Sequence, residues 1–267
     1  MKSPHAVAIL LALLILAGRS GAQSLPSAEA DASPDATAEQ VISPQMIPQR
    51  IATDQKRIWR FPVEAARGRG WKPALGVIGV TAGLIALDPT DTPLFQRVSY
   101  QQNAAVHGIS HVLSGTTTAL AIAAVPISFY IAGLVGKDSY ATNTALLAGE
   151  AVLNAEIVTV AFKDLDRRLR PSEVGPNGDF SDTWFRTKKR SIGGFGGFPS
   201  GHTVAAFSVA TVFAERYRNH RWAPWVAYGL ASVVGLSRLN AQAHFPSDIF
   251  FGAALGFSIS HFVVLRR

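Results

Sequence analysis

Long uncharged segments separated by short polar ones dominate the pattern of this chain. There is no sustained alternation of apolar and polar residues, which is the mark of a half-buried strand, and no internal repeat. The pattern therefore predicts an all-α protein, a helical bundle with five or six core helices. The helices expected in its C-terminal half cover 115–136, 140–162, 202–213, 222–237 and 249–265.

The second of these segments has helical length but carries polar residues at Glu150, Asn154 and Glu156. Unpaired polar groups are costly in an apolar environment. We therefore expect this helix to be screened inside the bundle.

The N-terminus has the pattern of a secretory signal. Lys2 is followed by an uncharged stretch from Ala6 to Ala17 and by small residues at Ser20 and Ala22. This stretch is too short to span a bilayer. We expect residues 1–22 to be a signal peptide that is cleaved after Ala22.

Composition divides the rest of the chain into three parts. Residues 23–49 are rich in Ala, Ser, Pro, Asp and Gln and predict a disordered linker. Residues 50–114 form an N-terminal helical region, and residues 115–267 form the bundle. Within the helical region, the uncharged run 73–87 is shorter than the ~20 residues of a span, so we expect it to lie at the membrane interface or to pack on the bundle.

Charge favours a membrane protein. Only 16% of the residues are charged, and the net charge of +7 comes from basic residues in membrane-flanking positions and in the candidate site, which argues against nucleic-acid binding. The remaining five crossings would satisfy the positive-inside tendency. Basic residues expected on the inner side are Lys137, Arg216, Arg218, Arg221, Arg266 and Arg267. A soluble bundle in the periplasm stays an alternative, and without cysteine its stability would come from packing alone.

Three blocks in the C-terminal half supply the groups that hold and attack a tetrahedral oxyanion. A lysine and two arginines can neutralise a phosphate, a helix start adds N–H donors, and two histidines can act as nucleophile and proton donor. The blocks are Lys163 to Arg170-Pro171, Pro199-Ser200-Gly201-His202, and Ser237-Arg238 followed by His244 and Asp248.

These blocks resemble the signature of the type 2 phosphatidic acid phosphatase superfamily, which includes bacterial acid phosphatases and vanadium haloperoxidases. The matching patterns are Lys-x6-Arg-Pro, Pro-Ser-Gly-His and Ser-Arg-x5-His-x3-Asp. The resemblance implies a helical bundle of the acid phosphatase/vanadium haloperoxidase type. It also implies that His244 forms a phosphohistidine, that Asp248 holds its other ring nitrogen, and that His202 protonates the leaving group. The phosphate would be bound by Lys163, Arg170, Ser200, Gly201 and Arg238.

Other interpretations of these residues stay open. Asp248 is also placed to cap a helix that begins at Pro246, and basic residues at helix ends commonly extend toward the interface. We accept that second interpretation for Arg167 and Arg168, which fall outside the pattern. A serine hydrolase built on Ser200 is disfavoured because Phe198 replaces the first glycine of a nucleophile elbow.

Two further features have less specific meanings. The segment 172–198 contains Trp184, a basic cluster and the glycine-rich run 193–197, which suits close backbone approach to a phosphate, lid motion or a solvated connector. His107 and His111 have the spacing of a metal pair on a helix, but no third ligand is near, so we expect a structural role. His220 and His261 are expected to be structural as well.

The function expected is hydrolysis of a phosphate monoester without a metal or another cofactor. The substrate class expected is a lipid phosphate, of the phosphatidic acid or isoprenoid phosphate type, and the site would face the extracytoplasmic side of a cell-envelope membrane. Alternatives are a soluble periplasmic acid phosphatase, a vanadate-dependent haloperoxidase and a binding protein without turnover. Vanadate would otherwise act only as an inhibitor. The sequence does not define the head group or the oligomeric state.

Overall fold

The structure is a computed structural model that describes residues 42–101, 115–174, 179–187 and 193–267. This part of the chain is helical and contains no strand, which confirms the all-α prediction. The predicted signal peptide, most of the predicted linker, and His107 and His111 lie outside the described residues.

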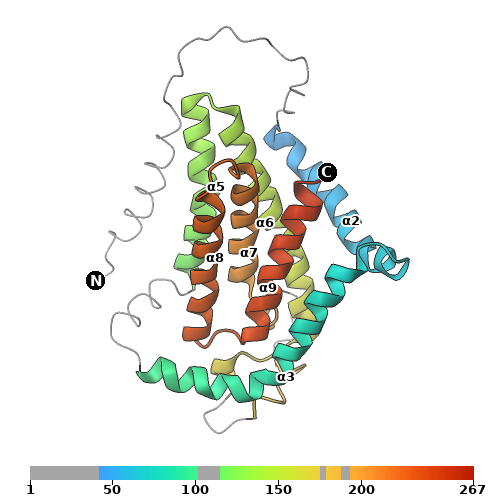
Figure 1. Cartoon of the computed structure of the whole chain (residues 1–267), viewed down its shortest axis with the longest axis vertical. Coiled ribbons are helices and arrows are strands. Elements are labelled where there is room, and N and C mark those ends of the chain that lie inside the picture. Colours follow the sequence, from blue (N-terminus) through green and yellow to red (C-terminus); the bar gives the residue numbers. More distant parts are fainter. Residues whose placement is uncertain (1–41, 102–114, 175–178, 188–192) are drawn as a thin grey trace. The chain divides into compact units, whose positions relative to one another are not determined.

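Five helices that run side by side form the bundle (Figure 1). Each of the five predicted segments is present, with ends that differ by a few residues from those expected. The helices are α5 (Thr116–Gly136), α6 (Ser139–Asp166), α7 (Gly201–Arg216), α8 (Ala223–Asn240) and α9 (Pro246–Ser258), the last continued by the π-helical turn η3 (Ile259–Val264).

The predicted linker extends too far toward the C-terminus. A short 3-10 helix, η1 (Pro44–Met46), leads into α2 (Ile47–Ala66), so residues 44–49 are helical. A buried polar cluster fixes α2 to α6: Arg50 Nε lies 2.8 Å from Glu150 Oε2, and Asn154 Nδ2 lies 3.0 Å from Asp54 Oδ2. The burial of Glu150 and Asn154 inside the bundle is confirmed, and composition alone could not reveal their partners on α2.

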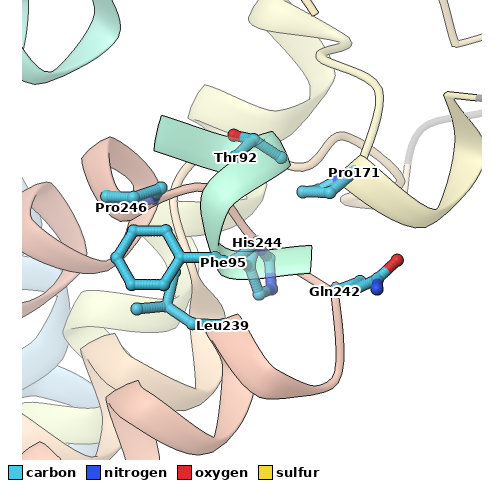
Figure 2. A pocket seen from close by; sticks show the side chains of 7 residues that line it. All are labelled: Thr92, Phe95, Pro171, Leu239, Gln242, His244 and Pro246. Carbon is cyan, nitrogen blue, oxygen red and sulfur yellow. The ribbon is translucent and has the colours of Figure 1, made fainter. Parts of the chain in front are cut away.

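The uncharged run 73–87 packs on the bundle, which was one of the two expectations, but it is part of a longer helix than expected. It belongs to α3 (Trp71–Gln101), which continues through Asp88 and two internal prolines, Pro89 and Pro93. Figure 1 shows that the axis of α3 turns along its length, as helices do at proline. Its first part lies along α9, and its later part crosses the end of the bundle, where Thr92 and Phe95 lie against His244 (Figure 2).

Four helices are long and apolar enough to cross a bilayer. They are Trp71–Phe95, Thr116–Gly136, Ser139–Glu173 and Pro246–Val264. Many large apolar side chains on these helices are exposed, for example Leu75, Leu120 and Val135. These features support a location in a membrane.

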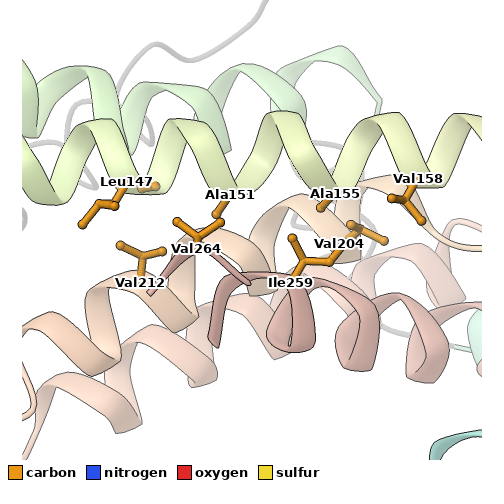
Figure 3. Close-up of a cluster of buried hydrophobic side chains, with 9 residues drawn as sticks. Leu147, Ala151, Ala155, Val158, Val204, Val212, Ile259 and Val264 are labelled. Carbon is orange, nitrogen blue, oxygen red and sulfur yellow. The ribbon is translucent and has the colours of Figure 1, made fainter. Parts of the chain in front are cut away.

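The core between α6, α7 and the end of the chain combines alanines of α6 with branched side chains (Figure 3). Ala148, Ala151 and Ala155 of α6 are fully buried against Val204 and Val212 of α7. Small residues let helices approach closely, which is a common packing solution in membrane proteins. The site residues at the ends of these helices are therefore held by a tightly packed core.

Two glycines of α9 allow its backbone to contact α7. A Cβ at Gly252 would lie 3.0 Å from the Ser200 carbonyl oxygen, and one at Gly256 would lie 2.4 Å from the Val204 carbonyl oxygen. The second distance is too short for any side chain. The spacing of the two helices therefore depends on Gly256.

We predict that Gly256→Ala lowers the free energy of unfolding by about 1–3 kcal/mol, because two packed backbones must separate. Thermal unfolding in detergent micelles measures the effect. Gly229→Ala in α8 is the matched control, since a Cβ there meets nothing within 4 Å. Equal melting temperatures for the two variants would contradict the close contact between α7 and α9.

Candidate active site

The first block begins in the last turn of α6. Lys163 lies in that turn, and the helix ends at Arg167, whose φ of 46° turns the chain toward Arg170. Beyond it the chain reaches the 3-10 helix η2 (Pro171–Glu173), and the Glu173 carboxylate accepts a hydrogen bond of 2.9 Å from the Arg170 backbone N–H. The left-handed conformation of Arg167 therefore sets the direction in which the chain runs from the end of α6 to Arg170.

The glycine-rich run packs directly on this block. A Cβ at Gly196 would lie 2.5 Å from the Lys163 carbonyl oxygen, and the Gly197 N–H donates to the Arg168 carbonyl at 2.7 Å. The close approach observed at Gly196 and Gly197 differs from the approach to a phosphate that the sequence suggested. The surface they approach is the backbone of the first block.

The second block begins α7. Ser200 is the N-cap residue and is fully buried; its N–H donates to the Asp248 carbonyl oxygen at 3.1 Å, and its Oγ accepts from Thr203 Oγ1 at 2.9 Å. A Cβ at Gly201 would lie 3.5 Å from Lys163 Nζ and 3.7 Å from both carboxylate oxygens of Glu156. The helix start therefore lies beside the lysine of the first block.

The third block places His244 between these segments. Its Nδ1 lies 2.7 Å from the Gly197 carbonyl oxygen and 3.5 Å from Asp248 Oδ2. The expected contact with Asp248 is thus the longer of the two, and Gly197 is the principal partner. Asp248 also accepts a hydrogen bond of 2.8 Å from the Phe245 N–H and belongs to the first turn of α9 after Pro246, so the capping role applies too.

Electrostatics show that the three blocks come together. Burial lowers the pKa of His244 to about 4; Asp248 opposes this shift, and the cations of Lys163 and Arg170 reinforce it. Burial also lowers the pKa of His202, and the positive charges of Arg238, Lys163 and Arg170 add to the effect. The two histidines thus share a site with the three predicted cations, and both favour the neutral state.

His202 has a partner that the sequence did not reveal. Its Nε2 lies 2.9 Å from the carbonyl oxygen of Gly115, the residue before α5. Because a carbonyl oxygen only accepts hydrogen bonds, Nε2 carries the proton in this arrangement. The ring therefore presents a donor toward an oxygen atom.

Arg168 is not an interfacial residue, contrary to the sequence-based interpretation. It is 1% exposed, and its guanidinium pairs with Asp88 Oδ2 of α3 and with Asp248 Oδ1, both at 2.6 Å. The rings of Trp184 and Phe245 cover it, with centroids 4.5 and 4.0 Å from Cζ. A charged residue next to an apolar segment needs a partner of opposite charge. Asp88, at the end of the run 73–87, was therefore the sequence feature from which an ion pair with a basic residue could have been expected.

His220 and His261, the other histidines considered from the sequence, lie outside this site. Within the described ranges, no group of three or more His, Cys, Asp or Glu side chains is arranged to hold a metal. His261 pairs with Glu215 at 3.0 Å, and the ring of His220 lies near those of Tyr217 and Trp222.

Fold and site together define a class: a helical membrane protein with a histidine in a cationic cradle at the end of its bundle. Comparison with known proteins gives the family. The family model of the PAP2 superfamily matches residues 144–267, and this part of the chain belongs to that superfamily. The assignment supports a phosphatase.

The identity of this chain to individual relatives is low or limited to a short segment. The chain is 27% identical to the lipid A 4'-phosphatase of Porphyromonas gingivalis over 64% of its length and 70% of that protein. It is 42% identical to the lipid A 1-phosphatase of the same organism, over 22% of this chain and 14% of that one. The crystal structure of a transmembrane PAP2 type phosphatidylglycerolphosphate phosphatase from Bacillus subtilis is 16% identical, with a TM-score of 0.45 over 71% of this chain and 92% of that chain.

Glu156 provides a test of the cradle, because its carboxylate lies beside Lys163 at the start of α7. We predict that Glu156→Gln strengthens binding of orthovanadate, a tetrahedral phosphate analogue, by about tenfold at pH 8, since a negative charge leaves the anion site. Inhibition constants for phosphate ester hydrolysis provide the measurement. Glu64→Gln on α2 makes the same change in net charge far from the cradle and should leave vanadate affinity unchanged; equal constants for both variants would refute the placement of Glu156.

Proposed function

We propose that this protein is a metal-independent phosphomonoesterase that hydrolyses a lipid phosphate through a phosphohistidine on His244. The observation that carries the proposal is the contact of His244 Nδ1 with the Gly197 carbonyl at 2.7 Å. A carbonyl oxygen can only accept, so Nδ1 holds the proton and Nε2 keeps its lone pair. With a pKa near 4, the ring stays neutral and nucleophilic across the physiological range.

The chemistry follows in two steps. The Nε2 lone pair forms a bond to phosphorus while the ester P–O bond breaks, and the leaving alkoxide takes the proton that His202 directs toward the Gly115 carbonyl. A water molecule then attacks phosphorus and gives a proton back to His202, and the electron pair of the P–N bond returns to His244. Lys163, Arg170 and Arg238 stabilise the charge on the phosphoryl oxygens in both steps.

Two observations favour a lipid substrate. Four helices have the length and composition of membrane spans, and the site lies at the ends of α6, α7, α8 and α9, where a head group at the bilayer surface would meet it. The curated relatives described above are lipid A phosphatases. The substrate we infer is therefore a lipid that carries a phosphate monoester, and the proposed chemistry uses no metal or other cofactor.

We predict that phosphate release from phosphatidic acid in mixed micelles exceeds release from p-nitrophenyl phosphate at equal concentration. His244→Ala should lower kcat by roughly 10³-fold or more, because the covalent step is lost. His220→Ala is the matched control, since the His220 ring lies near the rings of Tyr217 and Trp222, outside the site. Equal rates for the His244 variant and the wild type would point to a binding protein, and faster release from the soluble ester would remove the lipid assignment.

We propose further that the site faces the extracytoplasmic side. The α5–α6 and α7–α8 turns lie at the end of the bundle opposite the site (Figure 1), and they carry Lys137, Arg218 and Arg221. Positive residues in short loops favour the cytoplasm.

Because the chain contains no cysteine, single cysteines report on topology without a background. We predict that Ser181→Cys, exposed near the site, reacts with an impermeant maleimide in intact spheroplasts, whereas Arg218→Cys reacts only after lysis. The reverse pattern would place the site in the cytoplasm.

A further inference from the structure

A chain of buried charges connects α3 to the nucleophile. Asp88, Arg168 and Asp248 are each 0–1% exposed, and both ion pairs of the arginine measure 2.6 Å. Ser247 completes the group: it accepts from Arg168 Nη1 at 2.8 Å, and its Oγ donates to Asp88. Removing one member of such a group leaves a buried charge without compensation.

The arrangement has a direct consequence for His244. Arg168 Nη1 donates to Asp248 Oδ1, and the Phe245 N–H donates to Asp248 Oδ2. Two donors therefore fix the position of the carboxylate. Its Oδ2 stays 3.5 Å from His244 Nδ1, while the Gly197 carbonyl at 2.7 Å receives the ring proton. The guanidinium thus decides how strongly Asp248 acts on the imidazole.

The same group of buried charges also fixes the position of α3 beside the site. Asp88 precedes the part of α3 that contributes Thr92 and Phe95 to a small cavity with His244 (Figure 2). Leu239 and Pro246, from the end of α8 and the start of α9, line the same cavity. The Asp88–Arg168 pair is therefore the polar attachment of α3 beside the nucleophile.

We propose that Arg168 and Asp88 are positioning residues: Arg168 restrains Asp248 so that His244 keeps its Nε2 lone pair for attack, and Asp88 balances Arg168 and holds α3 in place. This inference rests on the proposed function. It adds two residues to the machinery of the reaction: Asp88, which lies outside the three sequence blocks, and Arg168, which lies within the first block but not at one of its specified positions. Neither of them needs to contact the substrate.

Substitutions of Arg168 and of Asp88 should shift the pKa of His244 in opposite directions. Arg168, Asp88 and Asp248 together carry one net negative charge, which becomes two in Arg168→Gln and zero in Asp88→Asn. More negative charge stabilises the imidazolium and raises the pKa of His244, and less lowers it. The other charges that act on His244 are Lys163 of α6 and Arg170 after α6. Groups that act on these charges or on Asp248 are Glu156 and Asp166 of α6, His202 of α7 and Arg238 of α8, and neither substitution replaces any of them.

The test is the pH dependence of kcat/KM for phosphatidic acid, with the purified full-length protein in mixed micelles. We expect the acidic limb to move up by about one pH unit in Arg168→Gln and to stay at or below the wild-type position in Asp88→Asn. In the double variant the net charge returns to minus one, so the limb should return to within about 0.3 units of the wild type. A structural role would lower activity further in the double variant and would leave the limb unmoved.

A second measurement does not depend on activity. The pKa of His244, followed by NMR in protein with ¹³C-labelled histidine, should shift in the same order as the acidic limb. Asp88→Asn is nearly isosteric and keeps the fold testable if Arg168→Gln does not fold. Unshifted pKa values in variants with wild-type melting temperatures would overturn the inference, whereas a wild type that releases no phosphate would instead overturn the proposed function.

Discussion

The guanidinium of Arg168 joins segments that lie far apart in the sequence. It pairs with Asp88 on α3, follows α6 by two residues, and pairs with Asp248 in the first turn of α9. A buried charge is tolerated only with complete compensation, and here two carboxylates, two hydroxyls and two aromatic faces provide it. The positions of the nucleophile and of α3 both depend on this one group.

The cradle itself gathers positive charges that repel one another. Lys163, Arg170 and Arg238 meet at the end of the bundle because rigid, closely packed helices hold their backbones there. Glycines make this packing possible, since Gly196 touches the backbone of the first block and Gly256 touches α7. A phosphate bound as proposed would relieve the repulsion, because the charge of the site is complementary to that of the anion.

Much of this site could be predicted from the sequence, because its cations and histidines stand in fixed local spacings at the ends of apolar helices. The partners of Arg168 could not be predicted in the same way, since Asp88 and Asp248 each lie 80 residues away. The length of α3 was missed because Asp88 was taken to end the apolar run, although its charge is compensated inside the protein. The Gly197 carbonyl was missed because a backbone acceptor leaves no mark in the residue pattern.

The central claim is that His244 accepts the phosphoryl group, and rapid chemical quench tests it most directly. Wild-type protein and His202→Ala would be mixed with ³²P-labelled phosphatidic acid, quenched in alkali and mapped by mass spectrometry. The account predicts an alkali-stable, acid-labile label on His244 in the wild type, which should form more slowly in His202→Ala because the first step then lacks its acid. Turnover with no label at any time, or with the label on another residue, would contradict it.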